Sequence, residues 1–188
     1  MEFITLLVVL GVIVVIALII VGIYNGLVQR RLRVDEAWSQ IDVQLKRRWD
    51  LIPNLVNAVK GYMEFEQDVL TKVTEARASA VTAGAQGPAA QAAAENGLTQ
   101  TLRSLFAVME NYPDLKANQN VLSLQEELTT TENLISFSRQ HYNATVREYN
   151  TAIATVPAVF VAGMFGFRAR EFFEAGEEAQ QVPEVRLR

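Results

Sequence analysis

The chain has 188 residues, half of them apolar, and a formal net charge of -4, so it can form one ordinary domain with an additional apolar element. It contains no cysteine, which excludes a disulfide framework, a thiol nucleophile and a thiolate metal site. The mildly acidic charge balance argues against nucleic acid as a partner.

The first predicted element is an uncharged apolar run from Phe3 to Tyr24. A helix of that length reaches about 33 Å at about 1.5 Å per residue, enough to cross the hydrocarbon core of a membrane. A cleaved signal peptide would instead need a basic segment before the run, a shorter apolar core and a small-residue cleavage site. We therefore expect residues 1–26 to be a transmembrane anchor that contacts membrane lipid.

Basic residues follow this apolar run closely, at Arg30, Arg31 and Arg33, whereas only Glu2 precedes it. Positive charge marks the cytoplasmic end of a membrane-spanning helix. We expect a single-pass protein with its N-terminus outside and the rest of the chain in the cytoplasm. The three membrane-proximal arginines are also candidates for contact with anionic lipid headgroups.

Beyond the anchor, apolar residues recur at alternating spacings of three and four, which indicates a long helix with one buried stripe. The stripe comprises Val34, Trp38, Ile41, Leu45, Ile52, Leu55, Val59, Tyr62, Val69, Val73, Ala76 and Ala80, and only Arg48 and Glu66 interrupt it. Because the spacing is the same on both sides of Pro53, we predict one helix over about residues 27–83, kinked at that proline. The alternative is a helix that ends at Asp50, which would then cap a new helix.

The stretch "AWSQIDVQLKRRWDLIPNLV", residues 37–56, is crowded with charge. Asp42 and Lys46 are four residues apart and can pair along the helix, while Gln44 and Arg48 share another face. Exposed pairs of this kind contribute only about 0.3 to 0.5 kcal/mol each. We therefore interpret these charges as surface support for a helix rather than as an active site.

Further helices follow a linker over residues 82–88, "TAGAQGP", in which Pro88 is placed to start the next helix. That helix is predicted to end before "NYPD", and the longest one covers about residues 115–156 with Val121, Leu128, Ile135, Tyr142, Tyr149 and Val156 spaced by seven. No strand pattern is present. The sequence predicts an all-α protein, with an antiparallel bundle of three to four long helices over residues 27–173 and a flexible acidic tail over 174–188.

Residues suited to catalysis are scarce. We interpret the only histidine, His141, as a surface or rim residue, and adjacent carboxylates such as Glu126 and Glu127 point about 100° apart on a helix, too far to act as a pair. The tyrosines before Asn143 and Asn150 either fill a layer of the bundle or, with those asparagines, form a polar ladder that fixes the helix register. We predict no catalytic, cofactor-binding or metal-binding residue, and hence a protein that is not an enzyme.

Two segments, "AWSQIDVQLKRRWDLIPNLVNAVKGY" and "LFAVMENYPDLKANQNVLSLQEELTTTENLISFSRQHYNATVREYN", resemble the LemA family of bacterial membrane-anchored proteins, and the resemblance covers nearly the whole chain. It implies an N-terminal transmembrane helix in the bacterial inner membrane, a cytoplasmic bundle similar to bromodomain-like four-helix folds, and no known reaction. Many members have His-Glu after "KGY" where this chain has Phe65 and Glu66, which further argues against a histidine-dependent site.

The family resemblance leaves three functional hypotheses. The first is a scaffold that forms homo-oligomers, with the apolar segment "AVFVAGMFGF", residues 158–167, at the end of the bundle distal to the membrane. Its candidate self-association residues are Phe160, Val161, Met164, Phe165 and Phe167. The second, suggested by an association of the family with membrane proteases, is an accessory subunit of a protease or quality-control system. The third is direct membrane remodelling, in which Arg30, Arg31, Arg33 and nearby charges act on the lipid headgroups.

Overall fold

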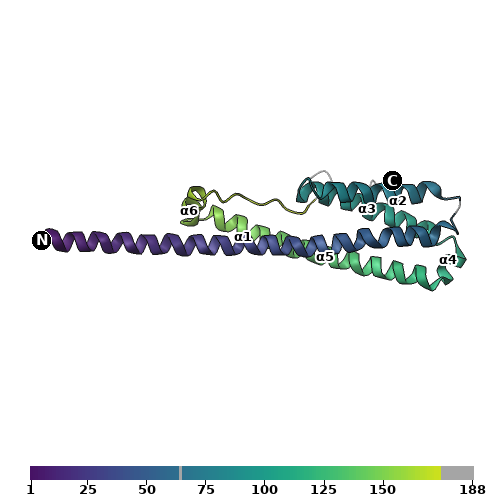
Figure 1. The fold of residues 1–188 in the computed structure, drawn as a ribbon, viewed down its shortest axis with the longest axis horizontal. Coiled ribbons are helices and arrows are strands. Elements are labelled where there is room, and N and C mark those ends of the chain that lie inside the picture. The colour runs from purple at the N-terminus through teal and green to yellow at the C-terminus, as the bar shows by residue number, and fades with distance from the viewer. Residues whose placement is uncertain (64, 175–188) are drawn as a thin grey trace, which may run out of the picture. The chain divides into compact units, whose positions relative to one another are not determined.

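The computed structural model describes residues 1–63 and 65–174, and within these ranges the regular structure is entirely helical. In chain order the helices are α1 (Glu2–Lys60), α2 (Gln67–Ala83), α3 (Pro88–Met109), α4 (Pro113–Ala117), α5 (Gln119–Ala154) and α6 (Ala158–Met164) (Figure 1). The predicted all-α class is confirmed. Apart from Glu174, the predicted acidic tail lies outside the described residues.

The helix α1 continues through Pro53 without interruption, so the alternative of a helix end at Asp50 is wrong. The predicted extension to residue 83 is also wrong, because α1 ends at Lys60 and a turn at Gly61 and Tyr62 leads to the separate helix α2. The connection between the two helices has a length that leaves the apolar residues of α2 in the same three-and-four spacing as those of α1. Val73, for example, fits the stripe of α1 in the sequence although it belongs to α2.

Pro53 is accommodated by a contact from α2. A proline has no backbone N–H, so the carbonyl four residues earlier loses its helical hydrogen bond. That carbonyl belongs to Trp49, and the Nε of Arg77 donates a hydrogen bond to it at 2.6 Å. The proline thus creates an acceptor in α1 that ties α2 to it.

The later helices begin at residues suited to that position. Gly87 has φ +107°, a conformation that favours glycine, and Pro88 and Pro113 each stand in the first turn of a helix, where the missing N–H costs nothing. Asn118 caps α5, because its Oδ1 accepts hydrogen bonds from the backbone N–H groups of Asn120 at 3.0 Å and Val121 at 3.3 Å. The predicted helix start at Pro88 is confirmed.

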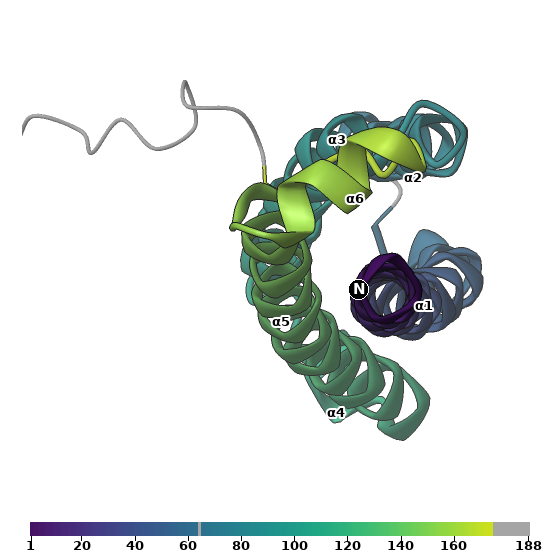
Figure 2. The ribbon, with the colours of Figure 1, turned by 90° about the vertical axis from the view of Figure 1, so that its left-hand side faces the viewer.

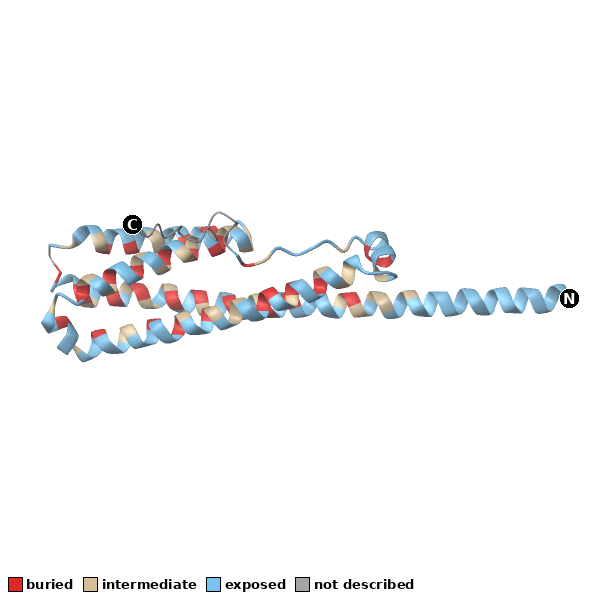
Figure 3. Cartoon of the chain, turned by 180° about the vertical axis from the view of Figure 1, so that it is seen from behind, coloured by how far each residue is buried: buried red, intermediate tan, exposed pale blue. Residues whose placement is uncertain are grey.

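The chain forms two compact units, and the bundle unit comprises residues 40–140 together with the described residues that follow 170. In it, α2 and α3 lie side by side (Figure 1). Its core draws on α1 to α5 and contains Ile52, Leu55, Val59, Met63, Leu70, Val73, Ala80, Leu98, Leu102, Leu105, Met109, Leu115, Val121 and Leu128. These buried positions form stripes along their helices (Figure 3), as expected for amphipathic helices that share one core.

The anchor unit comprises residues 1–39 and 141–170. Its N-terminal apolar residues are exposed (Figure 3), and this part of α1 is long and apolar enough to cross a membrane. Beyond them, the buried side chains are Leu27, Val34, Ala37, Tyr142, Asn143, Val146, Tyr149, Val161 and Ala162. Val156, predicted as the last core position of its helix, is instead 76% exposed because α5 ends at Ala154.

The segment 158–167 is not distal to the apolar run. The ring centroid of Phe165 lies 4.8 Å from that of Tyr24, the last residue of the run, so the predicted distal position is wrong. The turn after Lys60 adds one reversal of the chain that the sequence did not reveal. Within the anchor unit, α6 is set across the end of α5 (Figure 2) and follows it directly along the chain.

Candidate functional site

The bundle unit contains a buried arginine. Arg48 is 1% exposed, so its interpretation as part of the helix surface is wrong, whereas Asp42, Lys46 and Asp50 are exposed as expected. Arg48 occupies the stripe position of α1 between Leu45 and Ile52, both of which are buried. Its long side chain therefore points into the bundle, where a charge must be paired.

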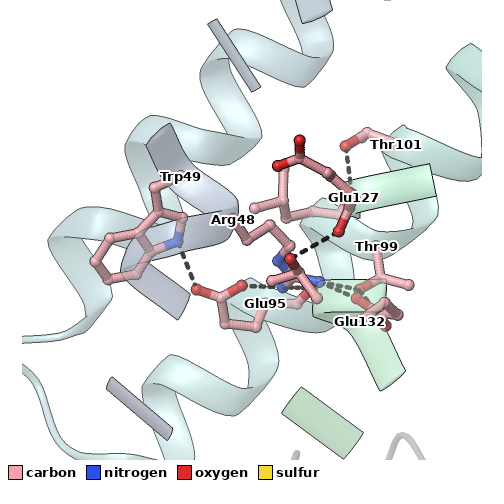
Figure 4. Close-up of polar contacts among 9 residues, drawn as sticks. Arg48, Trp49, Glu95, Thr99, Thr101, Glu127 and Glu132 are labelled. Atoms are coloured by element: carbon pink, nitrogen blue, oxygen red, sulfur yellow. Dashed lines mark hydrogen bonds and ion pairs between the residues drawn. The ribbon is translucent and has the colours of Figure 1, made fainter. Parts of the chain in front are cut away.

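Two carboxylates from different helices meet the guanidinium of Arg48 (Figure 4). Glu95 of α3 pairs with Nη2 and Glu132 of α5 pairs with Nη1. The same Nη1 donates a hydrogen bond to Thr99 Oγ1 at 3.0 Å, and the indole N–H of Trp49 donates to Glu95 at 2.8 Å. We call Arg48, Trp49, Glu95, Thr99 and Glu132 the arginine cluster. It links α1, α3 and α5 through one cation.

The two ion pairs differ in solvent exposure. The side chain of Glu95 is 4% exposed and that of Glu132 is 40% exposed, so the pair with Glu95 is the desolvated one. Among the described residues, the Nε of Arg48 is a buried atom without a hydrogen-bond partner. The cluster therefore joins three helices through one buried cation.

A pocket adjoins the arginine cluster. It has a volume of about 200 Å³ and is lined by Arg48, Glu132 and Thr99 together with Leu102, Phe106 and Leu128. Pockets for small molecules usually have about 300 to 1,000 Å³, and this one is smaller. Within the residues that the structure describes, no group of three or more His, Cys, Asp or Glu side chains is placed to hold a metal ion.

The sequence carries a signal for this cluster in the charges of two helix stripes. Counting back from Leu98 in steps of three and four places Glu95 and Gln91 on the buried stripe of α3, and both are buried. A lone charge on such a stripe suggests a break in the pattern. Opposite charges on the stripes of two helices, here Arg48 and Glu95, instead predict a buried pair.

A second cluster lies in the anchor unit, at the end of the apolar run. Phe167 contacts Tyr24 with ring centroids 5.7 Å apart, and the guanidinium of Arg31 lies over the Phe167 ring at 5.5 Å. Of the other two predicted membrane-proximal arginines, Arg30 donates to the carbonyl of Gly26 at 3.3 Å and Arg33 is exposed. Their contact with lipid stays a prediction.

The predicted self-association residues differ in accessibility. Phe160, Met164 and Phe165 are 70%, 72% and 51% exposed, whereas Val161 is buried at 5%. Phe167 is partly buried beneath Arg31. Val161 is therefore not available to another molecule in this conformation, and contact of the remaining residues with a second copy stays a prediction.

The segment that follows these residues is fastened to the two long helices of the anchor unit. Asn150 of α5 forms two hydrogen bonds of 2.9 Å with the backbone of Arg170, one through Nδ2 and one through Oδ1. The side chain of Arg170 pairs with Asp35 of α1 at 2.7 Å. Asn150 thus fastens a later part of the chain to α5. This role differs from the predicted one, in which Asn143 and Asn150 form a polar ladder that fixes the helix register.

The tyrosines of the anchor unit lie inside it. Tyr142 is buried, with its ring centroid 5.3 Å from that of Trp38, and Tyr149 is 1% exposed. Burial raises the pKa of Tyr149, an effect that the nearby Arg170 and Arg31 partly offset and Asp35 reinforces. His141 is exposed, in agreement with its interpretation as a surface residue.

These features define a class of protein: an all-helical protein with an apolar N-terminal helix able to cross a membrane, whose helices are joined by a buried arginine. Residues 37–187 match the model of the LemA family. The chain therefore belongs to the LemA family, as its motifs indicated. The apolar run itself lies outside the matched residues.

Similar proteins come from two settings. The chain is 24% identical over 189 residues to the magnetosome protein MamQ of Magnetospirillum gryphiswaldense, covering 86% of this chain and 70% of the relative. It is 25% identical, with the same coverage, to magnetosome protein MamQ 1 of Paramagnetospirillum magneticum. It is also 27% identical to Protein LemA of Metamycoplasma hominis over 159 residues, 84% of this chain and 71% of that one. Together with the apolar helix, these relatives identify a membrane-associated helical protein.

Proposed function

We propose that this chain is a non-enzymatic, membrane-anchored scaffold that self-associates through its helical bundle and thereby organises membrane or membrane-protein assemblies. The proposal has three parts: an anchor that concentrates copies in one membrane, a bundle that is held rigid, and an exposed surface by which copies meet. Each part is supported by a different feature of the chain.

The exposed surface is the observation that carries the proposal. Phe137 of α5 is 71% exposed and Leu134, one helical turn before it, is 39% exposed. Phe137 points away from the buried stripe formed by Leu128, Thr131 and Ile135, and Leu134 lies at the edge of that stripe. An exposed aromatic side chain one turn from a partly exposed aliphatic one is typical of a protein contact, where aromatic residues are enriched.

The arginine cluster holds the bundle rigid. Rigidity favours assembly, because a contact between copies costs less free energy when its side chains are already held in place. Arg48 joins α1 and α3 to Glu132, two residues before Leu134 on α5. The anchor adds effective concentration, since copies in one membrane meet far more often than copies free in solution. A weak contact through Phe137 is therefore sufficient for assembly on the membrane.

For the location we propose the bacterial inner membrane, with the N-terminus outside and the bundle in the cytoplasm. The support is the charge asymmetry around the apolar run, with Arg30, Arg31 and Arg33 behind it and Glu2 in front of it. A single cysteine introduced at exposed Phe137 tests this orientation in intact cells. A thiol reagent that cannot cross the membrane is expected to label it only after the cells are opened.

The test of self-association is the mass of the full-length protein after mild solubilisation, measured by light scattering with the detergent contribution subtracted. We expect a mass corresponding to more than one chain at micromolar concentration. The variant Phe137→Gln is expected to shift the protein toward a single chain. Phe65→Gln is the matched control, because Phe65 is 93% exposed in the connection between α1 and α2 and is not part of the proposed surface.

A single-chain mass for the wild type at micromolar protein would contradict the proposal, as would equal effects of the two substitutions. Crosslinking in native membranes separates it from the accessory-subunit hypothesis. Crosslinks mainly between copies support a scaffold, and crosslinks mainly to one unrelated membrane protein support an accessory subunit of a protease or quality-control system.

A further inference from the structure

We infer that Phe160, Met164 and Phe165 form a second membrane contact, which rests in the interfacial layer of the same membrane that α1 crosses. We call these three residues the interfacial patch. Its occupant is the headgroup and upper acyl region of a bilayer that contains anionic lipid. This contact is independent of self-association and depends only on the insertion of the apolar run.

The depth of the interfacial patch follows from its contact with Tyr24. This tyrosine is the last residue of the apolar run that begins at Phe3, and tyrosines at the ends of membrane-spanning helices lie at headgroup level. The ring centroid of Phe165 is 4.8 Å from that of Tyr24. Segments that lie in the interface bury their apolar side chains about 5 to 10 Å into the boundary between headgroups and acyl chains, so Phe165 is at the required depth.

The exposure of the patch supports the same conclusion. Phe160 is 70% exposed and Met164 is 72% exposed, while Val161 and Ala162 of the same helix are buried. The helix α6 thus has one face packed against the anchor unit and another face, apolar as well, exposed. For a segment beside the end of a membrane-spanning helix, lipid is the apolar surface that is always present.

The charges around the patch complement anionic lipid. From Thr151 to Arg170 the chain has no acidic residue and two arginines, Arg168 and Arg170. Of these, Arg170 pairs with Asp35 and so neutralises an acidic side chain near the end of the span. Arg30 and Arg33 are exposed on α1, and basic residues next to a membrane each contribute about 1 kcal/mol of attraction to anionic headgroups.

The patch is held in place rather than tethered loosely. Asn150 binds the backbone of Arg170, and Phe167 is enclosed between Tyr24 and Arg31. The interfacial patch therefore keeps a fixed height relative to the end of the apolar run. A second membrane contact at a fixed height restricts the tilt and rotation of the anchor unit on the bilayer.

The test uses the full-length chain in phosphatidylcholine vesicles that contain phosphatidylglycerol. Since the native sequence has no cysteine, Met164→Cys carries a single environment-sensitive fluorophore without further changes. Phe65→Cys is the control, because Phe65 is 93% exposed and lies outside both the interfacial patch and the surface proposed for self-association. Quenching is measured with nitroxides attached to lipid headgroups, and separately with iodide in the aqueous phase.

We expect the label at position 164 to be quenched several-fold more by the headgroup nitroxides than the label at position 65, and several-fold less by iodide. The variant Phe160→Cys provides an independent second site and is expected to behave like position 164. Equal quenching of the labels at 164, 160 and 65 by both reagents would overturn the inference.

Contact with a second copy is the competing outcome, and the ratio of protein to lipid distinguishes it. Lipid contact gives the same quenching when the protein is diluted tenfold into more vesicle lipid. Protection at position 164 that disappears on dilution would instead assign the patch to self-association and overturn the lipid contact. Because the mass measurement on Phe137→Gln does not involve the patch, either proposal can fail while the other stands.

Discussion

Replacement of Arg48 by methionine is the most direct test of the arginine cluster. Methionine preserves much of the volume of the side chain and removes its charge. The substitution leaves Glu95, whose side chain is 4% exposed, with the Trp49 indole as its remaining hydrogen-bond donor in the cluster. Glu132 also loses the cation, but its side chain is 40% exposed and can be hydrated.

The expected loss follows from these exposures. Removing one partner of a buried ion pair lowers the free energy of unfolding by about 3 to 5 kcal/mol, and the loss of an exposed pair adds no more than about 1 kcal/mol. We expect Arg48→Met to lose about 4 kcal/mol in total, dominated by Glu95. For a chain of this size, that loss lowers the melting temperature by about 10 °C.

The assay is urea unfolding of the full-length protein in detergent, followed by tryptophan fluorescence. The neighbouring substitution Arg47→Met is the matched control, because Arg47 is 50% exposed and lies 3.7 Å from Glu127. It is expected to change the free energy of unfolding by less than about 1 kcal/mol. The double substitution Arg48→Met with Glu95→Leu removes both buried charges and is expected to regain at least half of the loss.

Equal midpoints for Arg48→Met and Arg47→Met would refute the reasoning, because the argument depends entirely on the difference in burial between the two arginines. A double variant that is no more stable than Arg48→Met would also contradict it. That result would mean that the cost arises from packing around position 48 rather than from the unpaired carboxylate.

Three further predictions concern other contacts. Arg77→Met leaves the Trp49 carbonyl without its donor and is expected to lower the free energy of unfolding by about 1 to 3 kcal/mol. In a Pro53→Ala background the restored backbone N–H should reduce that loss, which a double-mutant cycle in urea measures. Asn150→Ala removes two hydrogen bonds to Arg170 and should speed tryptic cleavage after that residue. Burial raises the pKa of Tyr149. The stability that the protonated tyrosine contributes is therefore complete below the unfolded pKa of about 10 and is lost as the pH rises through the folded pKa. Tyr149→Phe should reduce this alkaline loss of stability in urea titrations.

Each of these predictions has an outcome that contradicts it. Additive effects of Arg77→Met and Pro53→Ala would mean that the proline does not create the acceptor. For Asn150→Ala the control is Thr151→Ala, an exposed neighbour on α5, and equal cleavage rates would show that the two hydrogen bonds do not hold the segment. For Tyr149→Phe the control is Tyr62→Phe at a side chain 45% exposed, and parallel alkaline curves for wild type and Tyr149→Phe would refute the assignment.

Helix formation and the buried stripe of α1 could be predicted because both are local. Val34, Ile41, Leu45, Ile52, Leu55 and Val59 were placed on the stripe from spacing alone, and all of them are buried. The start of α3 was equally clear, since Pro88 suits only the first turn of a helix. In each case neighbouring residues determine the outcome.

The direction of the chain and the arginine cluster depend on distant residues. The reversal after Lys60 has a weak local signal, a single glycine, and it preserves the apolar spacing, so the topology and the position of residues 158–167 were predicted wrongly. The local sequence predicts an exposed Arg48, because a charge is rarely buried without a partner. Its partners lie 47 and 84 residues further along the chain, and no local pattern connects them.

The distance between those partners bears on the order in which the protein is made. Arg48 emerges from the ribosome 84 residues before Glu132, an interval on the order of ten seconds at typical rates of synthesis. Until then only Glu95 is available to neutralise the arginine, and the face that α5 will cover is open to water. The nascent bundle must therefore wait for its last long helix, while the apolar run has already been free to enter the membrane.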